Sequence, residues 1–200
     1  MTPPLILASA SPRRRELLTQ LGLDFEVMPS DVPEQPLKSE TASEFAARIA
    51  REKAMHVAAQ RFQQWVLAAD TVVVVDGEIL GKPRDRDDAR RMLRLLSGRT
   101  HRVLTAVTLL APGGASADEV VIETSVRFRP VRAQEIEAYL DTDEPFDKAG
   151  AYAVQGRAAG FVEAVEGSYT NVVGLPLDEV GELCRRHGVL ATTRRAGTPV

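Results

Sequence analysis

The chain has 200 residues, 44% of them hydrophobic and 26% charged, and its formal net charge at pH 7 is −3. These values are typical of one medium-sized globular domain, and they exclude the strongly cationic surface that bulk binding to nucleic acid requires. A single cysteine, Cys184, excludes an internal disulfide framework. The sequence also has no signal-peptide pattern and no apolar run of 18 residues. Together these features predict a soluble, cytoplasmic protein that contacts no membrane.

The first third of the chain predicts two short strands and two helices. An apolar strand ends over Ile6–Ser9, and a helix begins at Pro12 and closes at Gly22. A second strand is expected over Phe25–Met28. After a loop rich in proline and acidic residues, a capping box opens a long helix over Thr41–Phe62.

The rest of the chain predicts both hairpins and strand–helix–strand units. The most strand-like stretch is Trp65–Val75, and Asp76-Gly77 predicts a turn into a strand over Glu78–Leu80. The other expected elements are, in chain order, a helix over Asp87–Leu96, strands over His101–Leu110 and Val120–Arg129, a helix over Ala133–Leu140, short strands over Tyr152–Val154 and Phe161–Val165, and a last helix from Pro176 to just before Gly188. We therefore expect the α/β class with a mixed sheet, followed by a flexible tail over residues 191–200.

Three consecutive arginines, Arg13–Arg15, stand in the first turn of the first helix. A helix N-terminus attracts anions, and the hydroxyls of Ser9 and Ser11 add donors beside guanidinium groups that suit phosphate oxygens. Cations oppose the helix dipole at this end, so their placement costs stability unless an anion is bound. The pattern favours a phosphate site, and the alternative is a solvated first turn.

Two charged residues interrupt apolar surfaces. Lys53 falls near the centre of the apolar arc of the second helix, so it must either extend outward along the neighbouring alanines or face an anion. Asp70 lies inside the apolar run of the longest strand, where a carboxylate is costly unless a metal, a cation or several donors satisfy it. The pattern favours a metal ligand or general base at Asp70 over a structural aspartate.

Two loop residues extend this charged set, although charged residues in loops are usually just solvated. Lys82 stands in the rigid Gly81-Lys82-Pro83 segment, and Glu34 is a second candidate oxygen ligand for a hard cation such as Mg²⁺. One cysteine and three scattered histidines exclude a standard zinc site, and the chain contains no Gly-rich P-loop. Several cations together with two carboxylates predict a metal-assisted polyphosphate site.

The segments that carry these residues resemble the Maf family of nucleoside triphosphate pyrophosphatases. They are LILASASPRRRELL, AREKA, AADTVVVVDGEILGKP, LSGRTHRVLTAV, and DEPFDKAGAYAVQG with GSYTNVVGLPL. The resemblance runs from Leu5 to about Gly188. It implies an elongated α/β fold of the inosine-triphosphatase type, in which two lobes of one domain over residues 1–190 surround a central cleft. It also implies a homodimer, because members of the family are often homodimers.

The resemblance implies hydrolysis of a nucleoside triphosphate between its α and β phosphates, which gives the monophosphate and pyrophosphate. A divalent cation (Mg²⁺, Mn²⁺ or Co²⁺) would be bound by Glu34 and Asp70. Asp70 would also be the proton acceptor, with Lys53 and Lys82 as further catalytic residues. The implied substrate-binding residues are Ser9, Arg13, Arg14, Thr71 and Gln155.

Base selection is implied for three of these positions, Arg13, Thr71 and Gln155. The segments around Gln155 resemble the branch that acts on dTTP and UTP, although Ala153 stands where that branch has glycine. Two alternatives remain: the same chemistry on 7-methyl-GTP, and a nucleotide-binding regulator of cell division without turnover.

Overall fold

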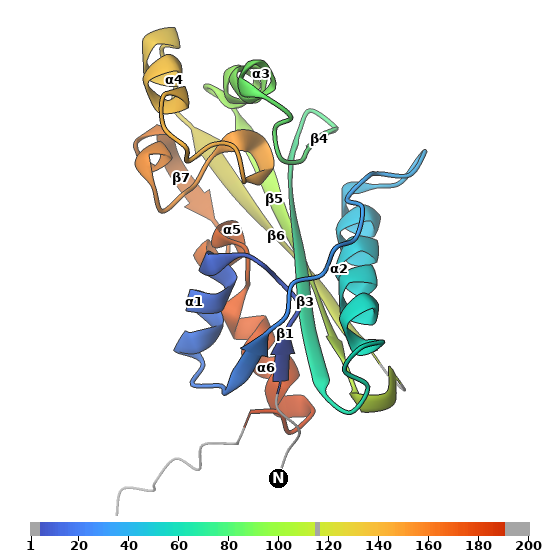
Figure 1. Cartoon of the computed structure of the whole chain (residues 1–200). Coiled ribbons are helices and arrows are strands. Elements are labelled where there is room, and N and C mark those ends of the chain that lie inside the picture. Colours follow the sequence, from blue (N-terminus) through green and yellow to red (C-terminus); the bar gives the residue numbers. More distant parts are fainter. Residues whose placement is uncertain (1–4, 115–116, 191–200) are drawn as a thin grey trace, which may run out of the picture.

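The structure is a computed structural model, and it describes residues 5–114 and 117–190. Within these residues seven strands form one mixed sheet in the order β2-β1-β3-β5-β6-β7, and β4 pairs with β3 (Figure 1). The strands are β1 Leu5–Leu7, β2 Phe25–Val27, β3 Trp65–Val75, β4 Glu78–Leu80, β5 Thr100–Leu110, β6 Ala117–Phe128 and β7 Val162–Glu166. The flexible tail expected over 191–200 lies outside the described residues.

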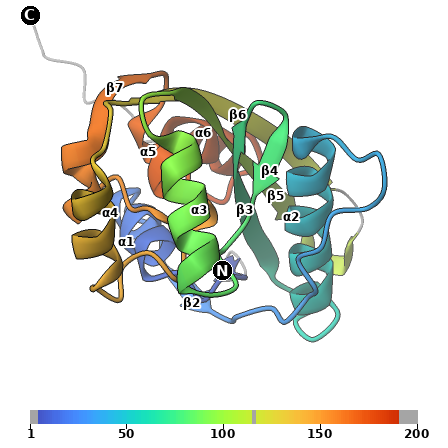
Figure 2. The same ribbon diagram turned by 90° about the horizontal axis from the view of Figure 1, so that it is seen from above.

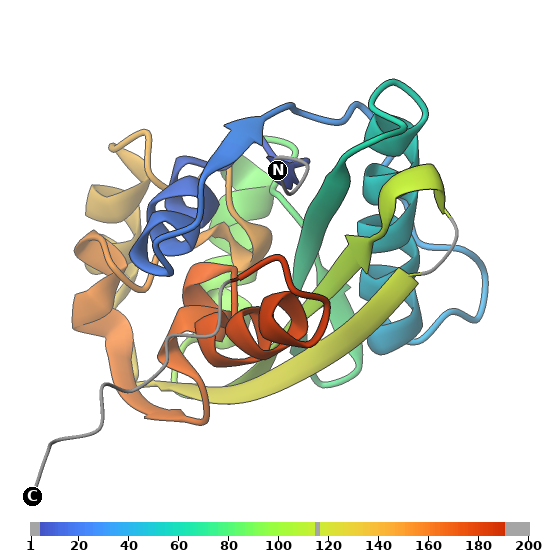
Figure 3. The ribbon, with the colours of Figure 1, turned by 90° about the horizontal axis from the view of Figure 1, so that it is seen from below.

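Helices cover both faces of this sheet (Figures 2 and 3). The α-helices are α1 Pro12–Gln20, α2 Ala42–Ala58, α3 Arg86–Leu96, α4 Ala133–Leu140, α5 Tyr169–Val173 and α6 Leu177–Arg186. Helix α2 packs against one face, whereas α1, α3, α4 and α6 share a hydrophobic cluster with the other face. No described helix has both the length and the apolar character needed to cross a membrane. The expected α/β fold with a mixed sheet flanked by helices is confirmed.

Strand β3 separates the two faces residue by residue, because successive side chains of a strand point in opposite directions. Leu67, Ala69 and Val73 belong to the large cluster under α1, α3, α4 and α6. The residues that alternate with them, such as Ala68 and Val72, pack under α2. By the same alternation, Asp70 lies on the face that α2 covers, and Thr71 lies on the opposite face.

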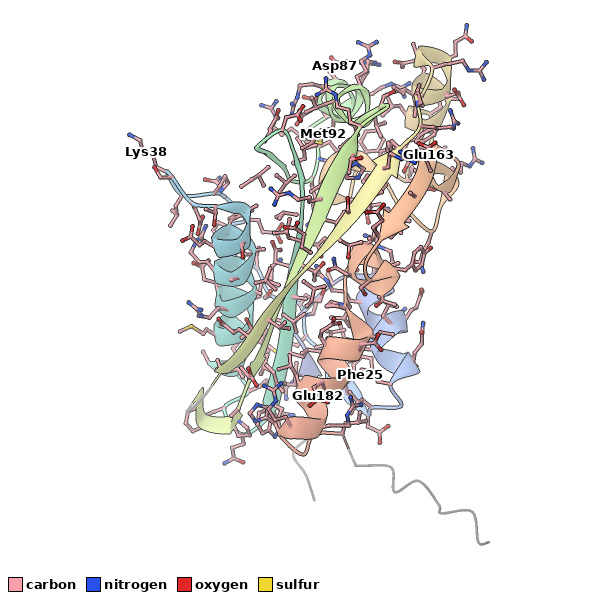
Figure 4. All side chains as sticks on the ribbon, turned by 180° about the vertical axis from the view of Figure 1, so that it is seen from behind. Phe25, Lys38, Asp87, Met92, Glu163 and Glu182 are labelled. Carbon is pink, nitrogen blue, oxygen red and sulfur yellow. The ribbon has the colours of Figure 1, made fainter. Side chains whose placement is uncertain are left out.

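The molecule is elongated along the long strands (Figure 1). Figure 4 shows Asp87 and Met92 of α3 and Glu163 of β7 near one end of the molecule, and Phe25 of β2 and Glu182 of α6 near the other. Between these ends, one edge of β3 changes partner. Strand β1 pairs with β3 only as far as Leu67, and β4 pairs with β3 only from Val73 onward. The edge between them is left without a strand partner among the described residues. The division into two lobes stays a prediction.

The local signals of the sequence are confirmed at most element boundaries. Ser11 caps α1, and its hydroxyl accepts a hydrogen bond from the Arg14 backbone N–H. The capping box of Thr41 and Glu44 opens α2. The Asp76-Gly77 turn has positive φ at both residues, 50° and 82°, as a tight hairpin turn requires. Helix α2 ends at Ala58, which is earlier than the expected end near Phe62.

Two expectations for the last third of the chain are corrected by the structure. The strand predicted over Tyr152–Val154 is wrong: Ala149–Ala151 forms a 3₁₀ turn and the apolar residues after it are buried without joining the sheet. Gly150 and Ala151 both have positive φ, which turns the chain away from an extended path. Helix α5, a five-residue helix capped by Ser168, was not predicted from the sequence.

Candidate active site

A cavity of about 660 Å³ opens along the unpaired edge of β3. This volume is typical of a small-molecule site. Because no described strand pairs with the edge there, side chains from both faces of β3 reach the same cavity. Its lining contains all nine site residues that the family resemblance implied: Ser9, Arg13, Arg14, Glu34, Lys53, Asp70, Thr71, Lys82 and Gln155. The third arginine of the run, Arg15, is exposed and does not line the cavity.

A charged cluster with a buried lysine–aspartate pair at its centre occupies the α2 side of the cavity. Lys53 Nζ donates to Asp70 Oδ1 at 2.7 Å and lies 2.6 Å from Glu34 Oε1. Lys53 is 7% exposed and Asp70 is 5% exposed, so the lysine faces anions and does not extend outward to solvent. Lys82 Nζ approaches Glu34 Oε2 at 3.4 Å from the rim. We call these four residues the carboxylate–lysine cluster.

The surroundings of the two carboxylates set their pKa values in opposite directions. Burial raises the pKa of Asp70, and the charges of Lys53 and Arg14 only partly oppose this rise. Burial also acts to raise the pKa of Glu34, but the combined charges and hydrogen bonds of Lys53 and Lys82 lower it. Asp70 is therefore the stronger proton acceptor of the pair, as a general base requires.

Arg14 lies on the other side of β3 as a half-buried cation. Its guanidinium donates to three uncharged oxygens: Gly174 O at 2.8 Å, Thr71 Oγ1 at 3.0 Å and Ser9 Oγ at 3.3 Å. Burial is the main cause that lowers the pKa of Arg14. A guanidinium has five N–H donors, and three of them are used in these bonds to described residues, so two could donate to an anion. This arrangement suits a phosphate oxygen.

The remaining predicted residues, Arg13 and Gln155, are more exposed than the Lys53–Asp70 pair. Arg13 Nη1 lies 3.8 Å from Asp147 Oδ2, and the Arg13 side chain is partly exposed. Gln155 is exposed and lines the cavity. It stands in a turn that the Gly156 N–H closes on Ala153 O at 3.1 Å. A turn, and not the expected strand, therefore presents Gln155.

The carboxylates of the site fit a metal that needs few protein ligands. Among the described residues no group of three or more His, Cys, Asp and Glu side chains is placed to hold an ion. Glu34 and Asp70 do converge, since both bond the same Lys53 nitrogen. Mg²⁺ often uses only one or two carboxylates, with water and substrate phosphates as its other ligands. The two carboxylates fit such a shared cation and do not form a closed protein site.

Several lining residues were not singled out from the sequence. Phe146, Asp147 and Lys148 come from the segment between α4 and the 3₁₀ turn. The Lys148 ammonium donates to the backbone oxygen of Glu144 at 2.7 Å, so its position is set within its own loop. The signal that could have found them is the concentration of charge in DEPFDK, just before the apolar run that carries Gln155.

Comparison with known proteins identifies the family of the chain. Residues 4–187 match the family described as Maf-like protein. A protein of Anaeromyxobacter dehalogenans named dTTP/UTP pyrophosphatase is 54% identical over 190 residues, which covers 94% of this chain and 96% of the relative. A protein of Geobacter sulfurreducens with the same name is also 54% identical, over 93% of this chain and 97% of the relative.

The fold is also found in a solved structure of much lower sequence similarity. The Staphylococcus aureus Ham1 protein gives a TM-score of 0.54 at 13% identity, and the match covers 92% of this chain and 99% of that chain. At this identity the likeness supports the fold alone. The family match, by contrast, extends over nearly the whole sequence and over every segment that lines the cavity. The chain belongs to the Maf-like protein family.

Proposed function

We propose that this chain is a nucleoside triphosphate pyrophosphatase that hydrolyses dTTP and UTP between the α and β phosphates. The observation that carries the proposal is that the carboxylate–lysine cluster and the half-buried Arg14 line one cavity. Cations on two sides suit a polyphosphate, and a buried carboxylate between them suits a proton acceptor. The names of the relatives support the same reaction.

In the proposed reaction Asp70 takes a proton from a water molecule as the water oxygen attacks the α phosphorus. The bond from that phosphorus to the bridging oxygen breaks, and pyrophosphate leaves with the electron pair. Lys53 and Lys82 stabilise negative charge on the phosphate oxygens as it shifts toward the leaving group. Ser9 and Arg14 bind phosphate oxygens from the α1 side. Glu34 and Asp70 would hold a divalent cation (Mg²⁺, Mn²⁺ or Co²⁺), which supplies charge neutralisation when bound.

Base selection is proposed for the end of the cavity that holds Gln155. A primary amide offers one acceptor and two donors, so it can pair with both the N3–H and a carbonyl of uracil or thymine. Cytosine has no N3–H, and one of these groups would be left unpaired. Arg13 and Thr71 are assigned to the same task, although Thr71 also holds the Arg14 guanidinium. We expect a preference for UTP over CTP of about 10- to 100-fold.

The remaining proposals concern location and assembly. We propose a cytoplasmic location, which a single buried cysteine supports because a reducing compartment needs no disulfide. The formal charge of −3 supports a small-molecule substrate over nucleic acid as the binding partner. A homodimer is proposed from the family resemblance.

A nucleotide panel tests the proposed function. The purified chain is incubated with Mg²⁺, Mn²⁺ or Co²⁺ and with dTTP, UTP, CTP or 7-methyl-GTP, and pyrophosphate and monophosphate are measured. We expect both products from dTTP and UTP, in equal amounts. Turnover of 7-methyl-GTP alone would contradict the substrate assignment. Tight nucleotide binding without product from any substrate would contradict the enzyme assignment and support a regulator.

A further inference from the structure

The carboxylate of Glu144 is linked to both ends of the segment that carries Gln155, directly at one end and through the Tyr139 hydroxyl at the other. Its Oε1 accepts from the Tyr139 hydroxyl at 2.8 Å, and its Oε2 accepts from the Arg157 backbone N–H at 3.0 Å. The Tyr139 hydroxyl in turn accepts from the Ala153 backbone N–H at 3.3 Å. One carboxylate therefore ties down the chain two residues before and two residues after Gln155.

Gly156 lets this carboxylate come close to the backbone. A Cβ atom added to Gly156 would lie 2.2 Å from Glu144 Oε1 and 2.4 Å from Oε2, far inside van der Waals contact. The φ of Gly156 is −105°, a value that any residue adopts, so the requirement for glycine here is steric and not conformational. The Glu144 carboxylate therefore packs against the backbone of Gly156, the residue that follows Gln155.

We propose that Glu144 is a positioning residue for base selection, which it performs by fixing the backbone on both sides of Gln155. This inference rests on the proposed function, because it assumes that the Gln155 amide pairs with the base. An amide discriminates between bases only if it cannot move to satisfy the wrong one, so a firmly held turn is needed. The carboxylate–lysine cluster comes from other segments, so loss of Glu144 leaves it in place.

The test compares the ratio of kcat/KM for UTP to that for CTP in a set of variants. Glu144→Gln keeps the size of the side chain but puts an NH₂ group where the carboxylate accepted a hydrogen bond. Gly156→Ala pushes the carboxylate away by contact. We expect Glu144→Gln and Gly156→Ala each to reduce this ratio by about tenfold, toward the ratio of Gln155→Ala. Because both changes disturb the same contact, the variant that combines Glu144→Gln with Gly156→Ala should reduce the ratio no further than either change alone.

Two further variants make the result specific. Glu137→Gln alters a carboxylate on neighbouring α4 that pairs with Arg86 and Arg90, and it should leave the ratio unchanged. Tyr139→Phe removes only the hydroxyl that links Glu144 to Ala153, and it should lower the ratio even if Glu144→Gln proves too unstable to assay. The melting temperature of each variant is measured alongside, because a purely structural role would lower the melting temperature without moving the ratio.

The outcomes separate this inference from the proposed function. If Gln155→Ala loses the preference while Glu144→Gln and Tyr139→Phe keep it, the role of Glu144 is wrong and base reading by Gln155 stands. If Gln155→Ala keeps the preference, base reading by Gln155 is wrong and the positioning role falls with it. Release of pyrophosphate from UTP by the unaltered chain tests the activity itself independently of both results.

Discussion

Lys53 holds two carboxylates together that would otherwise repel each other. Its nitrogen lies within 2.7 Å of oxygens on both Asp70 and Glu34. Since two carboxylates outnumber the one lysine, this trio keeps one negative charge, which Lys82 approaches from the rim. In the proposed reaction, a divalent cation beside this cluster would offset that negative charge next to the buried Lys53–Asp70 pair.

Replacement of Asp70 by asparagine tests the proton acceptor. We expect kcat for dTTP to fall by at least about 100-fold, the usual scale for losing a general base. Burial raises the pKa of Asp70, so its contribution to stability is present at low pH and is lost as the pH rises through the folded-state pKa. At neutral pH the melting temperature of Asp70→Asn should therefore be equal to or above that of the parent. A variant that keeps the parental kcat would contradict the assignment.

Lys53→Met tests how the lysine tunes Asp70. The charge of Lys53 lowers the pKa of Asp70, so its removal should raise that pKa further. Because a base works only when deprotonated, the acidic limb of the kcat/KM profile for UTP should move to higher pH. KM should also rise as a cation is lost. The control is Lys38→Met, which removes a lysine from the tip of the loop before α2 and should move neither quantity (Figure 4).

At the scale of elements, the short β1 strand and the β3–β4 hairpin together create the site. If β1 continued beyond Leu7 it would cover the edge of β3, and Asp70 and Thr71 would no longer open into one cavity. The chain instead turns at Ser9 into α1, whose first turn carries Arg13 and Arg14. The end of β1 therefore determines where the cavity opens in this sheet. Ligand sites in other α/β folds likewise lie where strands end.

Features that depend on nearby residues could be predicted from the sequence. The capping box at Thr41 and the hairpin turn at Asp76 are set by groups at most a few residues apart, and both are confirmed. Asp70 and Lys53 could be singled out because each interrupts an apolar pattern. The apolar run Tyr152–Val154 predicted burial correctly but pairing wrongly, since hydrophobicity alone does not specify a strand partner.

Features that depend on distant residues could not be predicted. Arg14 is fixed by Gly174 O, 160 positions away, and this contact exists only after the C-terminal part of the chain has folded back. Helix α5 is held by Asn171, which is fully buried and whose amide donates to Val103 O and Thr124 Oγ1. A five-residue helix has little stability of its own, so such contacts decide whether it forms.

The N-cap of α3 allows a test at this scale. The Asp85 side chain accepts from the Asp88 backbone N–H at 2.8 Å, and Asp85→Ala should lower the free energy of unfolding by about 1 kcal/mol. The matched control is Asp87→Ala, which removes an exposed carboxylate from the first turn of the same helix without removing a cap. Urea denaturation measures both. If both variants lost the same free energy of unfolding, the hydrogen bond of the Asp85 cap would contribute nothing beyond the negative charge of its carboxylate.

At the scale of the whole molecule, an aromatic cluster ties the central strands to the segment that follows the 3₁₀ turn. His101 on β5, Phe128 on β6 and Tyr152 pack edge to face, with ring centroids 4.8–5.4 Å apart. His101 Nε2 and the Tyr152 hydroxyl are 2.8 Å apart. Burial lowers the pKa of His101 from 6.5 to about 4. The folded chain therefore holds this ring neutral at a pH where the unfolded chain would protonate it.

This histidine makes the stability of the fold depend on pH. The lowered pKa contributes stability that is present above pH 6.5 and is lost as the pH falls through 6.5 toward 4. The loss should reach about 3 kcal/mol near pH 4. Urea denaturation of the parent and of His101→Gln between pH 7.5 and 4.5 isolates this contribution. The parent should lose more stability than the variant over that range, and parallel losses would contradict the explanation.

The unpaired edge of β3 also bears on how the protein avoids self-association. A bare strand edge invites a strand from another molecule to add to it, and proteins usually protect such edges with charge or with a cover. Here the edge lies in a concavity surrounded by the cationic first turn of α1, by Glu34 and by Lys82. An incoming strand would have to displace these charges from water. We therefore expect the charged residues of the proposed substrate site to protect the sheet against aggregation as well. Neutralising several of them together should reduce solubility as well as ligand binding.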